Sequence, residues 1–507
     1  TDVPYGRTFI DDISPSRLRL VAALNGFPIP PADDFDYCEL GSAHGDTTAV
    51  LAAANPRARF IGVDLSPAHT AIAKRQAAGG QLENVRFLER DFEDLGDVAI
   101  PDLDFIAAHG VLSWIGPAKR KALLEFASAK LKPGGLLYVG YNAQPGWAAV
   151  EPLRALLVSA GVGGSNDSQE RARRGLALAQ QLRDSGALYF KGNPSAGAML
   201  ATMEELGPAY IAHEYLNAYW EPMYFAQVAH EMAQNDLYFV GELPLYMNYR
   251  DLVVPPLMSK LFETVTDRAT FESLKDYALN EFFRRDVFIK GRTGRSAEAT
   301  QSYFDTTLFG VTAGFPAERE VRLPHHTLDF RSPLFDALFT AMHQGHASAA
   351  TLAQRPTLAP YSADDVRAAL LRSILGDCAG PMQSIDAVTP SDGKGFVVRS
   401  AYNRMVLRQT PSSDTPFVLG SQVTGRGHSI APLDAVCIRL LTEVPRSNWE
   451  SWTRSLFKKQ GVQLTVRGDA VQNERERVRA VLGEVEKLRV SPRMARWLEW
   501  RIVERAE

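Results

Sequence analysis

Residues 39–45 (ELGSAHG) carry two glycines and small side chains where an apolar, strand-like run passes into a helix-like run. Glycine lets the backbone turn tightly and approach a ligand closely, and the first N–H groups of a helix are free to bind it. A dinucleotide enzyme places GxGxxG here to receive pyrophosphate, whereas this loop reads GxxxG. The loop therefore predicts a cofactor without pyrophosphate, S-adenosylmethionine, although such turns also occur without ligands. The expected contacts in the loop are Gly41, Ser42, Ala43 and Gly45.

A carboxylate ends the next strand-like run, residues 59–64. Asp64 in this position can accept hydrogen bonds from the ribose hydroxyls, and Leu65 lies beside it at the same edge. The alternative is that Asp64 caps the helix that follows, but Ser66 before Pro67 suits that role better. We therefore expect Asp64 and Leu65 to contact the cofactor.

Asp91 and Phe92 follow a third strand-like run, residues 85–89. The carboxylate can accept from the exocyclic amine of adenine while the ring stacks on the base. The alternative for Phe92 is simple packing in the core. Glycine, aspartate and aspartate then stand after three successive strands, at the edge where open α/β sheets bind ligands. The three loops together are more specific than any one of them.

Two further loops, residues 109–114 (HGVLSW) and 141–147 (YNAQPGW), concentrate aromatic and hydrogen-bonding side chains. Methyl transfer is an in-line displacement that requires positioning, exclusion of water and an acceptor with a free lone pair. Aromatic walls suit a cationic, partly apolar acceptor such as lysine, and an Asn or Tyr oxygen can orient its amine. His109 and Gly110 are also expected beside the cofactor. The candidate catalytic residues are His109, Trp114, Tyr141, Asn142 and Trp147.

These side chains also have structural interpretations. Trp114 and Trp147 would then close the domain against the helices that follow. His109, which could act as a base, would be a hydrogen-bonded residue at a strand end. Glu214 and Asp286 could place carboxylates near an ammonium group, but both stand beside charged neighbours in helix-like contexts. Surface or interdomain ion pairs are the simpler interpretation for these two.

Short apolar runs alternate with helix-like stretches through the first third of the chain, as in a parallel α/β sheet. The fold class is therefore α/β, with a Rossmann-like class I methyltransferase domain that brings the five loops to one edge. The predicted strands are 36–40, 59–64, 85–89, 103–109 and 136–141, and the predicted helices are 47–55, 67–78 and 118–131.

The alternation of strands and helices stops after Asn142. Residues 149 to about 290 indicate several helices, residues 291–316 a polar linker, and the remainder short helices with strands at 396–399 and 404–407. The predicted parts are a cofactor-binding methyltransferase domain (1–148), a helical middle domain with a regulatory or substrate role (149–295) and a mixed α/β C-terminal region (318–507).

The composition excludes several classes of protein. The 507 residues are too many for one core, and the net charge of −4 gives no cationic field for nucleic acid or acidic lipid. No apolar run approaches the roughly 18 residues of a membrane span. Three separated cysteines without CxxC, and a start without signal-peptide character, favour the reducing cytosol. We expect a cytoplasmic protein with no metal and no nucleic acid partner, and a homodimer is left open.

Several segments resemble bacterial class I methyltransferases that carry a methyltransferase regulatory domain. Residues 109–114 and 141–147 are similar to that family's HGVYSWV and YNxxPGW segments. Residues 213–225 (HEYLNAYWEPMYF) are similar to its HEYL…P.YF stretch, and residues 283–288 (FRRDVF) to its FRRDxF stretch. The first residues of the sequence, which include Tyr5, are also similar to this family. Leu112 stands where the family usually has tyrosine, so any role of that phenol is absent here or supplied elsewhere.

The resemblance covers roughly residues 1–340 and implies S-adenosylmethionine as the cofactor. The chain is similar to rickettsial protein-lysine methyltransferases that act on outer-membrane proteins. That similarity implies Nε-methylation of lysine in a protein or peptide, such as an outer-membrane protein before its export. The same domain pairing occurs on many bacterial proteins, so two alternatives stay open. One is methyl transfer to a small molecule or a peptide natural product, and the other is a cofactor-binding interaction module without catalysis.

Overall fold

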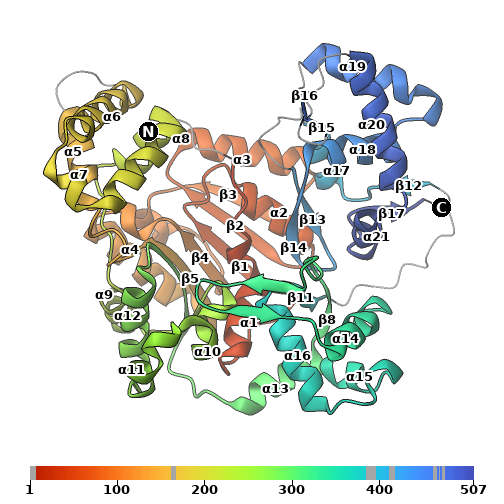
Figure 1. Cartoon of the computed structure of the whole chain (residues 1–507), viewed down its shortest axis with the longest axis horizontal. Helices are drawn as coiled ribbons and strands as arrows, with labels where there is room; N and C mark the ends of the chain where they lie inside the picture. The colour runs from red at the N-terminus through yellow and green to blue at the C-terminus, as the bar shows by residue number, and fades with distance from the viewer. Residues whose placement is uncertain are drawn as a thin grey trace.

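The structure is a computed structural model that describes residues 7–161, 167–383, 395–409, 417–460, 465–466, 469–470 and 474–506. A central sheet is flanked by helices, with α5–α7 at one end of the molecule and α18–α20 at the opposite end (Figure 1). Tyr5 lies outside the described residues. Within the described part of the chain, no helix has the length and apolar character needed to cross a bilayer.

The central sheet has seven strands in the order β3-β2-β1-β4-β5-β7-β6. The first five in this order pair in parallel, and β7 runs antiparallel to both β5 and β6. The strands are β1 (Asp36–Leu40), β2 (Arg59–Asp64), β3 (Val85–Glu89), β4 (Leu103–His109), β5 (Leu131–Asn142), β6 (Leu237–Glu242) and β7 (Phe283–Lys290). Loops at the carboxyl ends of the parallel strands therefore share one edge.

The sequence pattern predicted the first four strands at their observed bounds. Both faces of a parallel sheet are covered by helices, which is why β1 and β4 are buried almost throughout and consist mainly of apolar residues. Helices before and between these strands are α1 (Pro15–Leu24), α2 (Asp46–Ala54), α3 (Pro67–Gly79) and α4 (Pro117–Lys130). The fold is Rossmann-like, as the sequence predicted.

The expectation of helices alone across residues 149–290 was wrong, because β6 and β7 complete the central sheet. The physical reason is a set of charges inside the sheet. Arg284 on β7 is fully buried and forms ion pairs with four carboxylates. Such charges on a buried face hide the apolar alternation by which a strand is recognised. The four partners of Arg284 are Glu242, Glu272, Asp276 and Asp286.

The segments that precede these two strands are helical. Residues between β5 and β6 form α5 (Glu151–Gly161), α6 (Ser168–Asp184), α7 (Leu188–Gly192), α8 (Pro194–Tyr215) and α9 (Phe225–Gln234). Residues between β6 and β7 form α10 (Arg250–Val253), α11 (Ser259–Glu263) and α12 (Arg268–Leu279). Helices α5–α8 bury a hydrophobic cluster of their own. They are thus an insertion before the last two strands of the sheet.

The linker predicted at residues 291–316 was also wrong. It contains α13 (Ala297–Thr306) and β8 (Leu308–Val311), and β8 pairs with β11 (Ala379–Met382). Tyr303, Phe304 and Phe309 are buried in the main hydrophobic cluster, so these few aromatic residues outweigh the polar composition of the stretch. The elements that follow β8 are β9 (Glu320–Arg322), β10 (Thr327–Asp329), α14 (Pro333–His343), α15 (Ala349–Ala353) and α16 (Ala363–Leu375).

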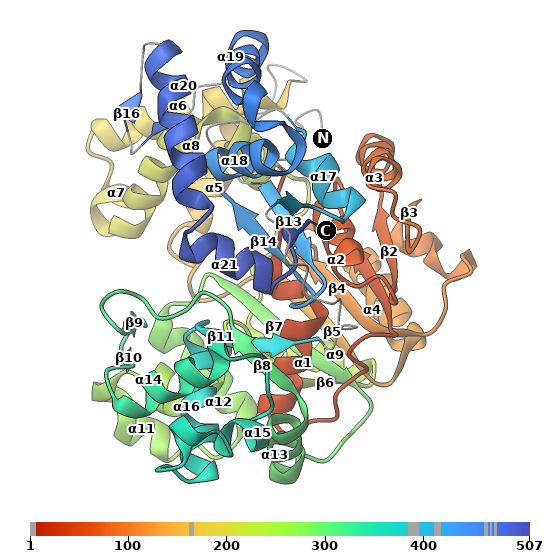
Figure 2. The same cartoon turned by 90° about the vertical axis from the view of Figure 1, so that its right-hand side faces the viewer.

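The last part of the chain packs against the outside of α2 (Figure 2). A Cβ atom on Gly420 would lie 3.1 Å from the carbonyl oxygen of Val50, so the β13–β14 hairpin approaches the helix closely. The strand expected at 404–407 is instead part of a helix, α17, because the Ser400 hydroxyl caps it by accepting from the Asn403 N–H. The elements are β12 (Phe396–Val397), α17 (Ala401–Leu407), β13 (Phe417–Ser421), β14 (Arg426–Ile430), α18 (Pro432–Glu443), α19 (Trp449–Gln460), β15 (Thr465–Val466), β16 (Asp469–Ala470), α20 (Glu474–Leu488), α21 (Pro492–Glu499) and β17 (Glu504–Arg505).

Candidate active site at the carboxyl edge of the sheet

A cavity of about 470 Å³ opens at the carboxyl edge of the parallel strands. Its volume lies within the range of about 300–1,000 Å³ that is usual for small-molecule sites. The loops after β1, β2, β4 and β5 contribute to its wall, together with α8 from the insertion. Eight residues predicted for the site line it: Gly41, Ser42, Ala43, Asp64, His109, Gly110, Trp114 and Asn142.

The loop after β1 is shaped by its glycines. Gly41 has a φ of +79°, and a Cβ atom there would lie 2.6 Å from Cγ2 of Val111 in the loop after β4. Glycine at this position therefore lets the two loops touch beneath the cavity. Gly45, with a φ of +71°, is the residue before α2 and packs against the ring of Phe87 rather than lining the cavity.

Asp64 holds the first two loops together. Its carboxylate accepts from the Ala43 N–H at 2.8 Å and from the Ser66 N–H at 2.8 Å. Nδ1 of His69 lies 3.2 Å from the same carboxylate. A carboxylate offers about four acceptor positions, so Asp64 keeps about one for a ribose hydroxyl. Ser66, and not Asp64, is the N-cap of α3, because its side chain accepts from the His69 N–H.

Glu39 was not among the predicted contacts, although it lines the same cavity. It is buried at the end of β1 and accepts a hydrogen bond from the hydroxyl of Thr48. Burial raises the pKa of the Glu39 carboxyl to about 8. Its place directly before the glycine loop was the signal in the sequence that could have identified it.

His109 is held by its neighbours at the end of β4. Its Nδ1 lies 2.8 Å from the hydroxyl of Tyr138, and its ring packs against Tyr138 and Phe283. Burial lowers the pKa of His109 to about 4, so the imidazole is uncharged near neutral pH. These contacts agree with the interpretation of His109 as a hydrogen-bonded structural residue at a strand end. His109 also lines the cavity.

The backbone of Asn142 is fixed on both sides. Its N–H donates to Oγ of Ser113 at 2.9 Å, and its carbonyl oxygen accepts from the Met223 N–H at 2.9 Å. The Glu221 N–H also donates to the Ser113 carbonyl oxygen at 2.8 Å. The segment between α8 and α9 is thereby attached to the loops after β4 and β5. This attachment positions the Asn142 side chain in the wall of the cavity.

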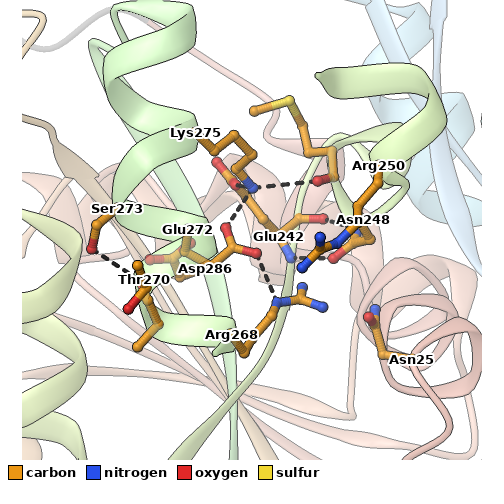
Figure 3. Close-up of polar contacts among 12 residues, drawn as sticks. Asn25, Glu242, Asn248, Arg250, Arg268, Thr270, Glu272, Ser273, Lys275 and Asp286 are labelled. Carbon is orange, nitrogen blue, oxygen red and sulfur yellow. Dashed lines mark hydrogen bonds and ion pairs between the residues drawn. The ribbon is translucent and has the colours of Figure 1, made fainter. Parts of the chain in front are cut away.

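Two of the candidate catalytic residues are not brought to the cavity. Tyr141 is fully buried, and its hydroxyl donates to Asp286 at 2.6 Å. Trp147 donates from Nε1 to the Phe282 carbonyl oxygen at 2.9 Å and packs edge-on against Trp220. Asp286 is on a strand and not in a helix, and it belongs to the buried ionic cluster that Figure 3 draws around Lys275.

Besides Gly45, three of the expected cofactor contacts lie outside the described lining of the cavity. Asp91 forms an ion pair with Lys119, and Phe92 packs against the hydrophobic cluster beneath α4. Leu65 is 61% exposed to solvent. Their roles therefore stay predictions from sequence position alone.

The insertion contributes residues that the sequence pattern did not place in the site. Helix α8 is interrupted at Gly207, whose φ is +83°, and Pro208 begins its second half. That half carries His213 and Glu214 into the lining of the cavity, and His213 packs edge-on against Trp114 with ring centroids 6.1 Å apart. The signal was the HEYL motif, but it did not indicate which of its side chains line the cavity.

The chemistry of the lining fits S-adenosylmethionine. Among the described residues that line the cavity there is no lysine or arginine, which suits a ligand without phosphate groups. The glycine loop offers backbone close to the ligand, and Asp64 offers a carboxylate at the position expected for a ribose.

Comparison with known proteins agrees with this geometry. A family described as a methyltransferase domain matches residues 38–137, and one described as a predicted methyltransferase regulatory domain matches residues 207–290. An uncharacterized protein of Synechocystis sp. is 27% identical over 94% of this chain and 93% of its own length. The trans-aconitate 2-methyltransferase of Methylobacterium nodulans is 34% identical over 22% of this chain and 40% of its own length.

The fold is also that of a solved structure. PKMT2 from Rickettsia typhi in complex with AdoHcy superposes with a TM-score of 0.69 at 19% identity, covering 96% of this chain and 99% of that one. The second family match begins at Gly207, where α8 turns towards the cavity, and ends with β7. The chain is thus an S-adenosylmethionine-dependent methyltransferase with a Rossmann-like fold, and its residues 207–290 match the family described as a predicted methyltransferase regulatory domain.

Proposed function

We propose that this enzyme methylates the Nε atom of lysine side chains in a protein substrate. The observation that carries the proposal is the lining of the cavity outside the loops after β1 and β2, to which Trp114, Asn142 and Glu214 all contribute. An aromatic ring and a carboxylate favour a cationic acceptor, and the described lining supplies no cation that would repel it. The likeness in fold to PKMT2 and the sequence resemblance to rickettsial protein-lysine methyltransferases support the same class of substrate.

When bound, the cofactor supplies a methyl group on a sulfonium as the electrophile. The chain supplies the position of the acceptor. Asn142 is fixed through its backbone and can accept a hydrogen bond from the incoming amine with its side-chain oxygen. Trp114 and His213 close one wall and exclude water from it.

Within this proposal each part of the chain has a task. Residues 1–148 hold the cofactor, residues 149–295 recognise the substrate, and residues 318–507 extend the surface available to it. The sheet is continuous through β7, so the first two parts act as one unit around the cavity. An outer-membrane protein before its export remains the acceptor that the sequence resemblance implies.

The test is transfer of label from S-adenosylmethionine carrying a tritiated methyl group. The enzyme is incubated with a lysate from cells that lack it, and the labelled protein is hydrolysed to amino acids. We expect the label in methylated lysine. Label confined to the small-molecule fraction would contradict the proposal. Tight cofactor binding with no transfer to any acceptor would favour an interaction module without catalysis.

Methyl transfer to a small molecule is the second candidate, because the match to trans-aconitate 2-methyltransferase reaches 34% identity over 111 residues. That match covers 22% of this chain and 40% of the other enzyme, so most of both proteins lies outside it. An acceptor bearing several carboxylates needs cationic partners, whereas Glu214 and Asp64 are acidic. The described lining therefore favours an amine over a polycarboxylate.

A further inference from the structure

Four carboxylates line the cavity, and three of them already have partners. Glu39 accepts from the Thr48 hydroxyl, and Asp64 accepts from two backbone N–H groups. Asp46 forms an ion pair with Arg7 at 2.6 Å. The fourth carboxylate, Glu214, has no ion pair with a lysine or arginine among the residues that the structure describes.

Glu214 comes from the insertion and not from the cofactor-binding loops. Gly207 and Pro208 redirect α8, and its last turn places His213 against Trp114 and Glu214 in the cavity wall. The glycine loop and Asp64, which line the same cavity, come instead from the loop after β1 and from the end of β2. A carboxylate without an ion pair in the described residues, carried by an element that no cofactor loop belongs to, is a candidate partner for a second, cationic molecule.

We propose that the Glu214 carboxylate binds the ammonium group of the substrate lysine and removes its proton before methyl transfer. This inference rests on the function proposed above and names the base of that reaction. The proton passes from Nε to the Glu214 carboxylate, which leaves a neutral amine and a carboxylic acid. The freed lone pair forms the bond from nitrogen to the methyl carbon, the carbon–sulfur bond breaks, and its electron pair stays on sulfur.

The electrostatic surroundings of Glu214 support this role. Burial raises the pKa of the Glu214 carboxyl to about 7, and a base with a pKa near the working pH is the most effective. Burial also lowers the pKa of His44, His109 and His213, which line the same cavity, so these histidines are uncharged near neutral pH. The other titratable side chains that line the cavity are Glu39, Asp46, Asp64 and His69.

A matched pair of variants on α8 tests the proposal. Glu214→Gln keeps the shape of the side chain and removes its basicity, whereas Glu205→Gln makes the same change at an exposed position of the same helix. Poly-L-lysine serves as the acceptor, and methylated lysine is measured after hydrolysis. We expect Glu214→Gln to lower kcat by about 10²- to 10⁴-fold at neutral pH. Glu205→Gln should match the unchanged enzyme.

The pH profile separates a base from a structural residue. The activity of the unchanged enzyme should rise as pH increases through about 7, where Glu214 loses its proton. In Glu214→Gln the activity should show no step near pH 7. It should instead increase steadily with the fraction of neutral substrate lysine, whose pKa is about 10.4. Affinity for AdoHcy, measured by calorimetry, should be unchanged and also reports whether the variant is folded. Should it fail to fold, Glu214→Asp should keep the step near pH 7 with a lower kcat.

The two proposals fail in different ways. If the unchanged enzyme yields no methylated lysine on poly-L-lysine or on any lysate protein, the proposed function is wrong and this inference falls with it. If the unchanged enzyme is active and Glu214→Gln retains both its kcat and the step near pH 7, only the role of Glu214 is overturned.

Discussion

The hydroxyl of Tyr141 on β5 donates to the carboxylate of Asp286 on β7 at 2.6 Å, across 145 positions of the sequence. Both side chains are fully buried. Tyr141 directly precedes Asn142, whose side chain lines the cavity. The hydrogen bond therefore connects the edge of the site to the ionic cluster that joins β6 and β7.

Tyr141→Phe removes this hydroxyl and little else. The change leaves a buried carboxylate oxygen with one donor fewer, which costs about 1–3 kcal/mol of stability. We expect a lower midpoint in thermal unfolding and little change in AdoHcy affinity, because the ring does not line the cavity. A variant with unchanged stability and no methyl transfer would instead place the phenol in the reaction.

Lys275→Met should destabilise the protein strongly. Lys275 is 1% exposed, lies 2.6 Å from Glu242 and also pairs with Glu272 (Figure 3). Removing this cation leaves buried carboxylates uncompensated, which costs about 3–5 kcal/mol. Arg268→Met is the matched control, because Arg268 pairs with the same Glu272 but is 33% exposed. A partly exposed pair contributes only about 0–1 kcal/mol, so equal effects in unfolding experiments would contradict this account of the cluster.

Asp64→Asn tests the ribose contact. The amide keeps an oxygen that can accept from the loop but loses the charge that strengthens a bond to a ribose hydroxyl. We expect the Kd for AdoHcy, measured by calorimetry, to rise about ten- to hundredfold, since a hydrogen bond to a charged group contributes about 1.5–3 kcal/mol. Asp94→Asn, at an exposed position after β3, is the control. Equal affinity in the two variants would remove Asp64 from the cofactor site.

Glu39→Gln should change how stability depends on pH. Burial raises the pKa of Glu39 to about 8 from its ordinary value of 4.5, so the folded state holds this proton more tightly than the unfolded state. Stability therefore falls as pH rises from about 4.5 to about 8. The glutamine variant has no proton to lose, and its unfolding temperature relative to the unchanged protein should increase from pH 5 to pH 8. A constant difference would mean that Glu39 is ionised throughout.

Sequence patterns predicted the cofactor half of the fold because its strands are apolar and its loops carry recognisable residues. The apolar runs gave the bounds of β1–β4, and the loop residues gave Gly41, Asp64 and Asn142, which line the cavity. Strand β7 was missed because Arg284 and Asp286 are charged and yet buried. Only the three-dimensional arrangement shows the partners that make such burial tolerable.

The site residues divide along the same line. Loop positions after parallel strands can be assigned from the order of strands alone, because that order fixes the shared edge. The direction of a side chain cannot be assigned from the order of strands. For this reason Tyr141 and Trp147 were expected in the site, whereas Glu214 was assigned to an ion pair. Gly207 and Pro208, which turn α8 towards the cavity, give no sign in the sequence of where the redirected helix ends.

The late position of β7 in the sequence also determines when the central sheet can be completed during synthesis. β5 pairs with β7 from Leu136 to Asn142, so during synthesis this edge has no partner until residues 283–290 have left the ribosome. An unpaired edge of buried strand is a template for association with other chains. The nascent protein thus passes through a long stage with a complete glycine loop and an open sheet. A gene truncated after the cofactor half would encode a product fixed at that stage and prone to aggregate.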